Sequence, residues 1–130
     1  MANIRRNIVE QNVTGLAVFG SSLLLVEENH VSRNREAGVS IGGHAKGEFK
    51  KNTITENEGP NIKVSASAAP ILFDNMIAAG LSQGLVFSGS AKGTALKNKI
   101  ELNQLVQVLI KDEAAPILQN NFICNGKSTG

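Results

Sequence analysis

Short apolar segments recur along the chain with a period of 23 residues. Within each repeat, two apolar residues stand two positions apart, which is the spacing of a strand with one buried face. No apolar segment reaches the roughly ten residues expected of a helix. The pattern therefore predicts three short strands per repeat. The columns that carry it are Val39, Ile62, Leu85 and Val108; Ile41, Val64, Phe87 and Ile110; and Val26, Phe49, Leu72, Ala95 and Leu118.

Asparagine follows the same period. Side-chain amides at equivalent positions of stacked repeats can donate to and accept from one another, so the column predicts a structural ladder. Its members are Asn29, Asn52, Asn75, Asn98 and Asn121. In a second polar column glycine replaces asparagine twice, which predicts a turn position with positive φ. Its members are Asn12, Asn34, Asn57, Gly80, Asn103 and Gly126.

These periodicities predict an all-β fold. We expect a single-stranded, right-handed parallel β-helix with five to six coils of about 23 residues and three short strands per coil. One β-helix domain is expected over residues 1–126, followed by a disordered tail at 127–130. Leucine-rich repeats are the competing prediction, but they require a regular leucine ladder and an asparagine at another phase.

The repeat units also carry a family resemblance. Two kinds of segment alternate: Ala45-Lys46-Gly47 and Ala91-Lys92-Gly93 with Ala69-Pro70-Ile71-Leu72 and Ala115-Pro116-Ile117-Leu118. Each is followed by Asn-x-Ile and then by a strand such as Gly38-Val39-Ser40-Ile41. The chain resembles the pectin-lyase-like β-helix repeats of carbohydrate-binding and sugar-hydrolase proteins, and is most similar to the β-helix of the F-box substrate receptors of ubiquitin ligases. Without F-box helices or a Cys/His zinc module in the sequence, the resemblance implies only a platform that binds a substrate or partner.

Composition narrows the function classes. The net charge is +2, with 13 basic and 11 acidic residues scattered along the chain, so neither nucleic-acid nor membrane binding is predicted. The single cysteine, Cys124, favours a reducing compartment, so an intracellular location, cytoplasmic or nuclear, is expected. Arg5 and Arg6 are not followed by the apolar stretch of a signal peptide.

Candidate chemical groups do not gather in the sequence. Glycoside hydrolysis needs two facing carboxylates, but the outward column of the Val39 strand holds Ala17, Ser40, Lys63, Val86 and Leu109. Asp74 and Asp112 fall at different phases of the repeat, as do His30 and His44. We therefore predict no enzymatic activity, no cofactor and no metal site.

The most informative outward positions are apolar. Several in neighbouring coils form a patch, and such patches mark interfaces. The expected partner-binding residues are Ile71, Phe73, Val86, Leu96, Leu109 and Ile117. They predict a non-enzymatic scaffold, or a substrate-recognition fragment of a larger protein, that binds a protein partner or a second copy of itself. The unpaired end rungs are a further place for self-association. Two alternatives stay open: a bulge or a terminal segment that hides these positions, and a carbohydrate-binding or carbohydrate-active β-helix.

Overall fold

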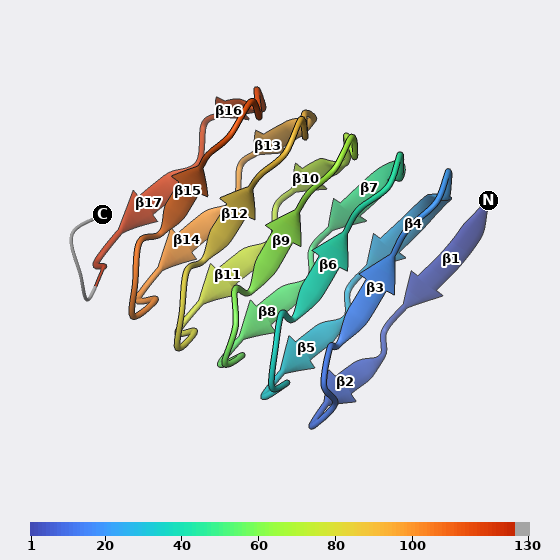
Figure 1. The fold of residues 1–130 in the computed structure, drawn as a ribbon. Coiled ribbons are helices and arrows are strands. Elements are labelled where there is room, and N and C mark those ends of the chain that lie inside the picture. Colours follow the sequence, from blue (N-terminus) through green and yellow to red (C-terminus); the bar gives the residue numbers. More distant parts are fainter. Residues whose placement is uncertain (127–130) are drawn as a thin grey trace.

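The computed structural model describes residues 1–126, which form a stack of parallel β-coils (Figure 1). Sheet A comprises β1 (Ala2–Arg5), β4 (Leu23–Glu27), β7 (Lys46–Lys50), β10 (Ile71–Phe73), β13 (Thr94–Leu96) and β16 (Ile117–Gln119). Sheet B comprises β2 (Ile8–Glu10), β5 (His30–Ser32), β8 (Thr53–Thr55), β11 (Met76–Ala78), β14 (Lys99–Glu101) and β17 (Phe122–Cys124). Sheet C comprises β3 (Leu16–Val18), β6 (Val39–Ile41), β9 (Ile62–Val64), β12 (Leu85–Phe87) and β15 (Val108–Ile110).

The register of the sheets confirms the predicted fold. Every strand pairs in parallel with its equivalent one coil away, so Ile54 lies beside Ile77 and Leu72 beside Ala95. Only the first coil is shorter, with Val9 beside Val31. The structure is therefore the expected all-β solenoid with three strands per coil. It is not a leucine-rich repeat. The tail predicted at 127–130 lies outside the described residues.

The core is narrow and continuous along the rod. Each strand of sheets A and B contributes mainly one inward side chain, and each strand of sheet C contributes two. Burying one such aliphatic or aromatic side chain contributes about 1.5–3 kcal/mol. The small residues between sheets C and A, among them Ala45, Ala68 and Ala91, are also fully buried. Other fully buried core residues include Val31, Val39, Ile41, Phe49, Ile54, Ile62, Val64, Leu72, Ile77, Leu85, Phe87, Ala95 and Ile100.

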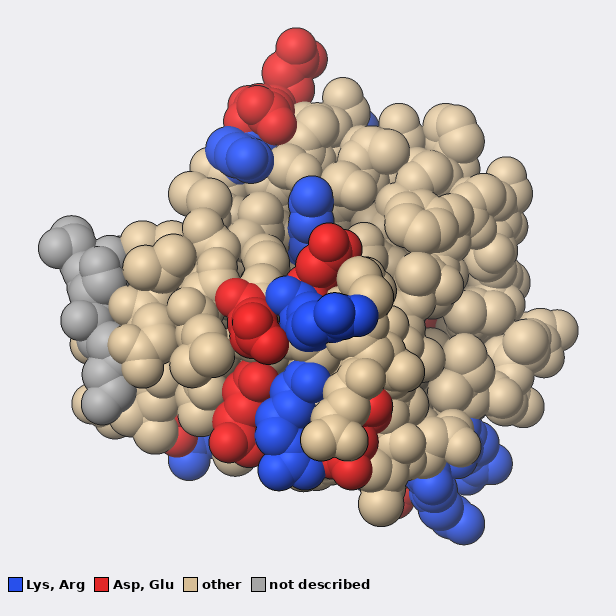
Figure 2. Space-filling view, turned by 60° about the horizontal axis from the view of Figure 1, so that its bottom comes forward, with Lys and Arg blue, Asp and Glu red and all other residues tan. Residues whose placement is uncertain are grey.

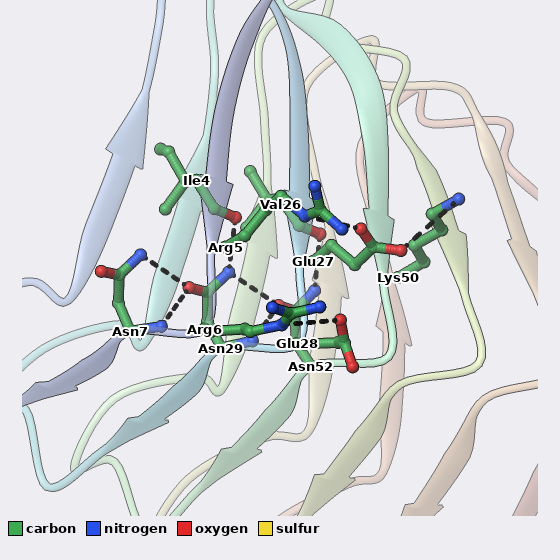
Figure 3. A network of polar contacts seen from close by, with 10 residues as sticks. All are labelled: Ile4, Arg5, Arg6, Asn7, Val26, Glu27, Glu28, Asn29, Lys50 and Asn52. Carbon is green, nitrogen blue, oxygen red and sulfur yellow. Dashed lines mark hydrogen bonds and ion pairs between the residues drawn. The ribbon is translucent and has the colours of Figure 1, made fainter.

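The predicted asparagine ladder is confirmed at the turn from sheet A to sheet B. The backbone N–H and the Nδ2 of Asn52 both donate to Asn75 Oδ1 at 3.0 Å, and Nδ2 also donates to the Val26 carbonyl at 3.0 Å. Asn29 makes the same contacts to Asn52 (Figure 3). The residue before each ladder asparagine has a positive φ, 59° at Glu28, so the strand direction changes sharply there. The side-chain amide satisfies backbone groups that this turn would otherwise leave unpaired.

The second asparagine column is a second ladder, and the predicted positive φ at its positions is wrong. Asn34 donates from its N–H and Nδ2 to Asn57 Oδ1 at 3.0 and 2.8 Å, and both side chains are fully buried. The left-handed residue is the one before, such as Arg33 (53°) or Glu56 (56°). Asparagine stands here because its amide bonds the next coil, not because its backbone needs freedom.

Asn61 fills the place where Gly80 interrupts this second ladder. Its Oδ1 accepts from Asn57 Nδ2 at 2.8 Å, and its Nδ2 donates to Asn103 Oδ1 at 2.8 Å. The second ladder therefore continues through the side chain of Asn61, which belongs to the coil before Gly80. A Cβ added at Gly80 would lie 2.7 Å from Asn61 Nδ2, so glycine and Asn61 require each other.

Gln107 compensates in the same way for the last interruption of the second ladder, at Gly126. Gln107 stands four residues after Asn103, as Asn61 does after Asn57, and Gly126 follows one coil later. Gln107 Oε1 accepts from Asn103 Nδ2 at 2.7 Å. The residue four positions after Asn34 is Gly38, and the next coil carries Asn57 in the ladder. A Cβ added at Gly38 would collide with Asn57 Nδ2, so glycine is required there. The two positions in adjacent coils are therefore coupled.

Candidate functional site

The outward face of sheet A changes character halfway along the rod. In the early coils it is charged: Arg5 Nε lies 3.1 Å from Glu27 Oε1, and Lys50 Nζ lies 3.7 Å from Glu27 Oε2 (Figure 3). In the same column, the later coils carry Phe73 and Leu96. A charged half and an apolar half therefore share one sheet.

Four of the predicted partner-binding residues lie together on this apolar half. Ile71 and Ile117 are 44% and 59% exposed, and Phe73 and Leu96 are half-buried neighbours in register. Strand alternation turns all four away from the core residues of β10, β13 and β16. Their predicted outward orientation is confirmed. We call Ile71, Phe73, Leu96 and Ile117 the apolar face.

The two remaining predicted residues lie on sheet C and do not extend the apolar face. Val86 stacks on Leu109 in register, as expected, but Val86 is only 4% exposed. Its neighbours Leu85 and Phe87 point into the core, so Val86 points outward and is covered by other parts of the chain. The prediction that Val86 presents a binding surface is therefore wrong, and Leu109 is half-buried beside it.

Sequence reasoning missed a polar groove beside sheet C. It has a volume of about 360 Å³ and is lined by residues of the first three coils. Figure 2 shows acidic and basic side chains gathered together on one face of the rod. The turn residues of this groove were not predicted, because the sequence pattern gives an inward or outward direction only for side chains in strands. The lining residues are Thr14, Arg35, Glu36, Ala37, Ser40, Glu58, Gly59, Pro60 and Lys63.

The four charged groups of this groove form no ion pair among those found within residues 1–126. Arg35 and Lys63 are free to donate hydrogen bonds, and Glu36 and Glu58 are free to accept them. Elsewhere on the rod, carboxylates such as Glu10 and Glu27 are paired with arginine. The groove can therefore hydrogen-bond a polar ligand.

The residues with soft or imidazole donor atoms are spread over several coils. His30 and Met76 occupy one outward column of sheet B, separated by the coil of Thr53. Cys124 is half-buried, and its Sγ lies 3.7 Å from Glu101 Oε1. Burial, and then the charge of Glu101, raise the pKa of the Cys124 thiol. Within residues 1–126, no three His, Cys, Asp or Glu side chains lie close enough together to hold a metal ion.

Comparison with known proteins gave one family. The family described as periplasmic copper-binding protein (NosD) has a model that matches residues 1–130. Neither the search of curated proteins nor the search of solved structures found a match. In the described residues, no helix has the length and apolar character needed to span a bilayer.

The family match corrects one expectation and supports another. NosD is described as a periplasmic family, which points to an extracytoplasmic location, so the cytoplasmic or nuclear location inferred from the lone Cys124 is wrong. The repeat part of the expected resemblance is supported, whereas the likeness to F-box receptors is not shown. Because the match spans the whole sequence, the chain belongs to the NosD family of β-helix repeat proteins.

Proposed function

We propose that this chain is a non-catalytic β-helix that presents a protein-binding face on a rigid rod. The observation that carries the proposal is the apolar face, where Ile71 and Ile117 are exposed beside half-buried Phe73 and Leu96. Apolar side chains grouped on one exposed strand face have a solvation cost that a partner would remove. Two buried asparagine ladders beneath the surface hold the strands in place.

The surroundings of the apolar face have the anatomy of a small interface. Polar residues border it: Lys50 in the preceding coil, Thr94 between the two exposed isoleucines, and Gln119 beside Leu96. Binding energy at interfaces concentrates in a few apolar residues that a polar rim shields from water. Four side chains are few compared with the roughly 20–30 residues per side of a standard stable interface. We therefore expect a partner held in a reversible complex.

The experiment is a capture assay with matched variants. The double variant Ile71→Ser/Ile117→Ser removes the two exposed residues without touching the core. The control is Leu23→Ser, which changes an exposed apolar residue in the charged half of the same sheet. Immobilised wild type and Leu23→Ser should retain the same protein from a periplasmic extract, and the double variant should lose it. Equal retention by all three would contradict the proposal.

Carbohydrate binding is the second candidate function, and the polar groove is the observation that favours it. Sugar hydroxyls both donate and accept hydrogen bonds, as the unpaired Arg35, Lys63, Glu36 and Glu58 require. The described residues offer no aromatic side chain in the groove on which a sugar ring could stack. Binding to a panel of soluble polysaccharides that Glu58→Gln weakens would favour this function, and cleavage of any of them would overturn the non-catalytic proposal.

Copper, which the family description names, has no part in this proposal. Copper sites need converging imidazole, thiolate or thioether ligands. At about 4.8 Å per coil, the backbones of His30 and Met76 are roughly 10 Å apart, and Cys124 lies roughly 20 Å from His30. His44 lies in a turn between sheets C and A. This donor set does not fit a copper centre formed by one chain.

A further inference from the structure

The turns that connect sheet C to sheet A line up along one edge of the rod (Figure 1). In the turn after β12, the Ala91 N–H donates to the Ser88 carbonyl at 3.2 Å, as expected of a β-turn. One residue in each of these turns has a positive φ, between 56° and 71°. These residues stack in one column from coil to coil: Gly20, Gly43, Ala66, Gly89 and Asp112.

One backbone amide of this column already binds a carboxylate. The Gly89 N–H donates to Asp112 Oδ2 at 3.0 Å, from the equivalent position one coil later. Gly20, Gly43 and Ala66 are each followed in the column by a residue without a carboxylate. Among the hydrogen bonds of residues 1–126, the N–H groups of these three residues have no acceptor. The early turns of this edge therefore have free amides of the kind that holds a carboxylate in a later turn.

A pocket lies at the same edge, directly after the free amide of Gly20. Its lining residues come from the turn into β4 and from the equivalent turn into β7 one coil later. Its volume of about 360 Å³ is near the lower end of the range for small-molecule pockets. The pocket is therefore large enough for a small ligand. The lining residues are Ser21, Ser22, Leu23, His44 and Lys46.

The pocket has hydrogen-bond donors and no carboxylate. Lys46 takes part in none of the ion pairs found within residues 1–126, and the side chains of His44 and Ser21 form no hydrogen bond there. An ammonium group, an imidazole N–H and a hydroxyl can each donate to an anion. The Ser22 hydroxyl is already engaged, since it donates to the Phe19 carbonyl at 2.7 Å. With a lysine and no acid in its lining, the pocket favours a negatively charged ligand, unlike the polar groove with its two glutamates.

We propose that this pocket binds a small organic carboxylate. The ligand accepts hydrogen bonds from Lys46 and Ser21, and from the Gly20 N–H in the way that Asp112 accepts from Gly89. Hydrogen bonds between charged groups are stronger than those between neutral ones. Leu23, which is 54% exposed, provides an apolar contact for the carbon chain of the ligand. The pocket shares no residue with the apolar face, so this proposal does not depend on the proposed function.

The test is a titration of isotope-labelled protein with butyrate, followed by the backbone amide signals in NMR spectra. The signals of Gly20, Ser21, His44 and Lys46 should shift and reach saturation. Butyramide has a similar shape but no charge, so it should leave them in place. Lys46→Gln should raise the Kd for butyrate about threefold or more, the scale of an exposed ion pair. The matched control is Lys92→Gln, which changes the equivalent position two coils later and should leave the Kd unchanged.

A charge reversal tests the pocket independently of Lys46. His44→Glu places a carboxylate in the lining and should abolish butyrate binding. Glu113 occupies the equivalent position three coils later, so the fold should tolerate this change, which circular dichroism can confirm. Shifts that do not saturate, equal binding of butyramide, equal effects of Lys46→Gln and Lys92→Gln, or undiminished binding in folded His44→Glu would overturn the proposal. Inorganic phosphate that binds more tightly than butyrate would overturn the assignment to a carboxylate.

Discussion

The coupling between Asn61 and Gly80 predicts a reciprocal rescue. Asn61→Gly takes the acceptor away from buried Asn57 Nδ2, while the Gly80 N–H still donates to Asn103 Oδ1 at 2.9 Å. An unpaired buried donor costs about 1–3 kcal/mol, and the added glycine about 1 kcal/mol. We therefore expect a loss of about 2–4 kcal/mol in the free energy of unfolding, a large share of the roughly 5–15 kcal/mol that holds a domain together.

The second single variant should fail for the opposite reason. In Gly80→Asn the new Cβ meets Asn61 Nδ2 at 2.7 Å, and overpacking of this kind costs about 1–3 kcal/mol. The double variant Asn61→Gly/Gly80→Asn recreates the arrangement of the preceding coil, in which Gly38 accompanies Asn57. The introduced asparagine would then accept from Asn57 and donate to Asn103, so the double variant should return to within about 1 kcal/mol of wild type.

Urea unfolding followed by circular dichroism measures all four chains of this cycle. A coupling energy of about 2 kcal/mol or more in the stabilising direction is expected, well above the roughly 0.3–0.5 kcal/mol scatter of independent sites. Destabilisation in the double variant equal to the sum of the single losses would refute the coupled ladder.

Three further predictions concern the core, the first ladder and the thiol. Phe49→Ala should lower the free energy of unfolding by about 3–5 kcal/mol, because Phe49 is fully buried between coils; a loss below about 1 kcal/mol in urea unfolding would contradict its place in the core. Asn52→Ala strips the acceptor from two donors of Asn29 and should cost about 2–5 kcal/mol, whereas Asn7→Ala, at the exposed end of the ladder, should cost less than about 1 kcal/mol; equal effects would argue against the ladder. Glu101→Gln removes a charge that raises the pKa of Cys124, so more thiolate forms and iodoacetamide should alkylate Cys124 faster at about pH 8.5; since burial is the larger cause, alkylation should stay slower than that of free cysteine.

The sequence predicted the fold because one coil returns each residue to an equivalent place. That periodicity located the strands, the core columns and the ladder from Asn29 to Asn121. It also placed Ile71, Phe73, Leu96 and Ile117 outward, since alternation within a three-residue strand follows from one buried column.

Features outside the periodic strands could not be found in this way. The replacement of asparagine by glycine at position 80 suggested backbone freedom, and only the structure shows Asn61 reaching into the gap. A signal was present, since each glycine in that column follows a coil with Asn61 or Gln107 four residues after its asparagine. Strand alternation predicts that Val86 points outward, but it does not predict that Val86 is buried there. Glu36 and Glu58 of the groove lie outside the strands, where the repeat gives no inward or outward direction. A single cysteine was too weak a basis for the compartment.

The most direct measurement is nuclear Overhauser contact between side-chain amides along the stack. In uniformly labelled protein, the Nδ2 protons of Asn52 should show cross-peaks to the amide groups of Asn29 and Asn75, 23 residues away on either side, with the same pattern repeated at Asn75 and Asn98. Cross-peaks confined to residues three or four positions apart, or asparagine amides without contact to one another, would contradict the stacked coil.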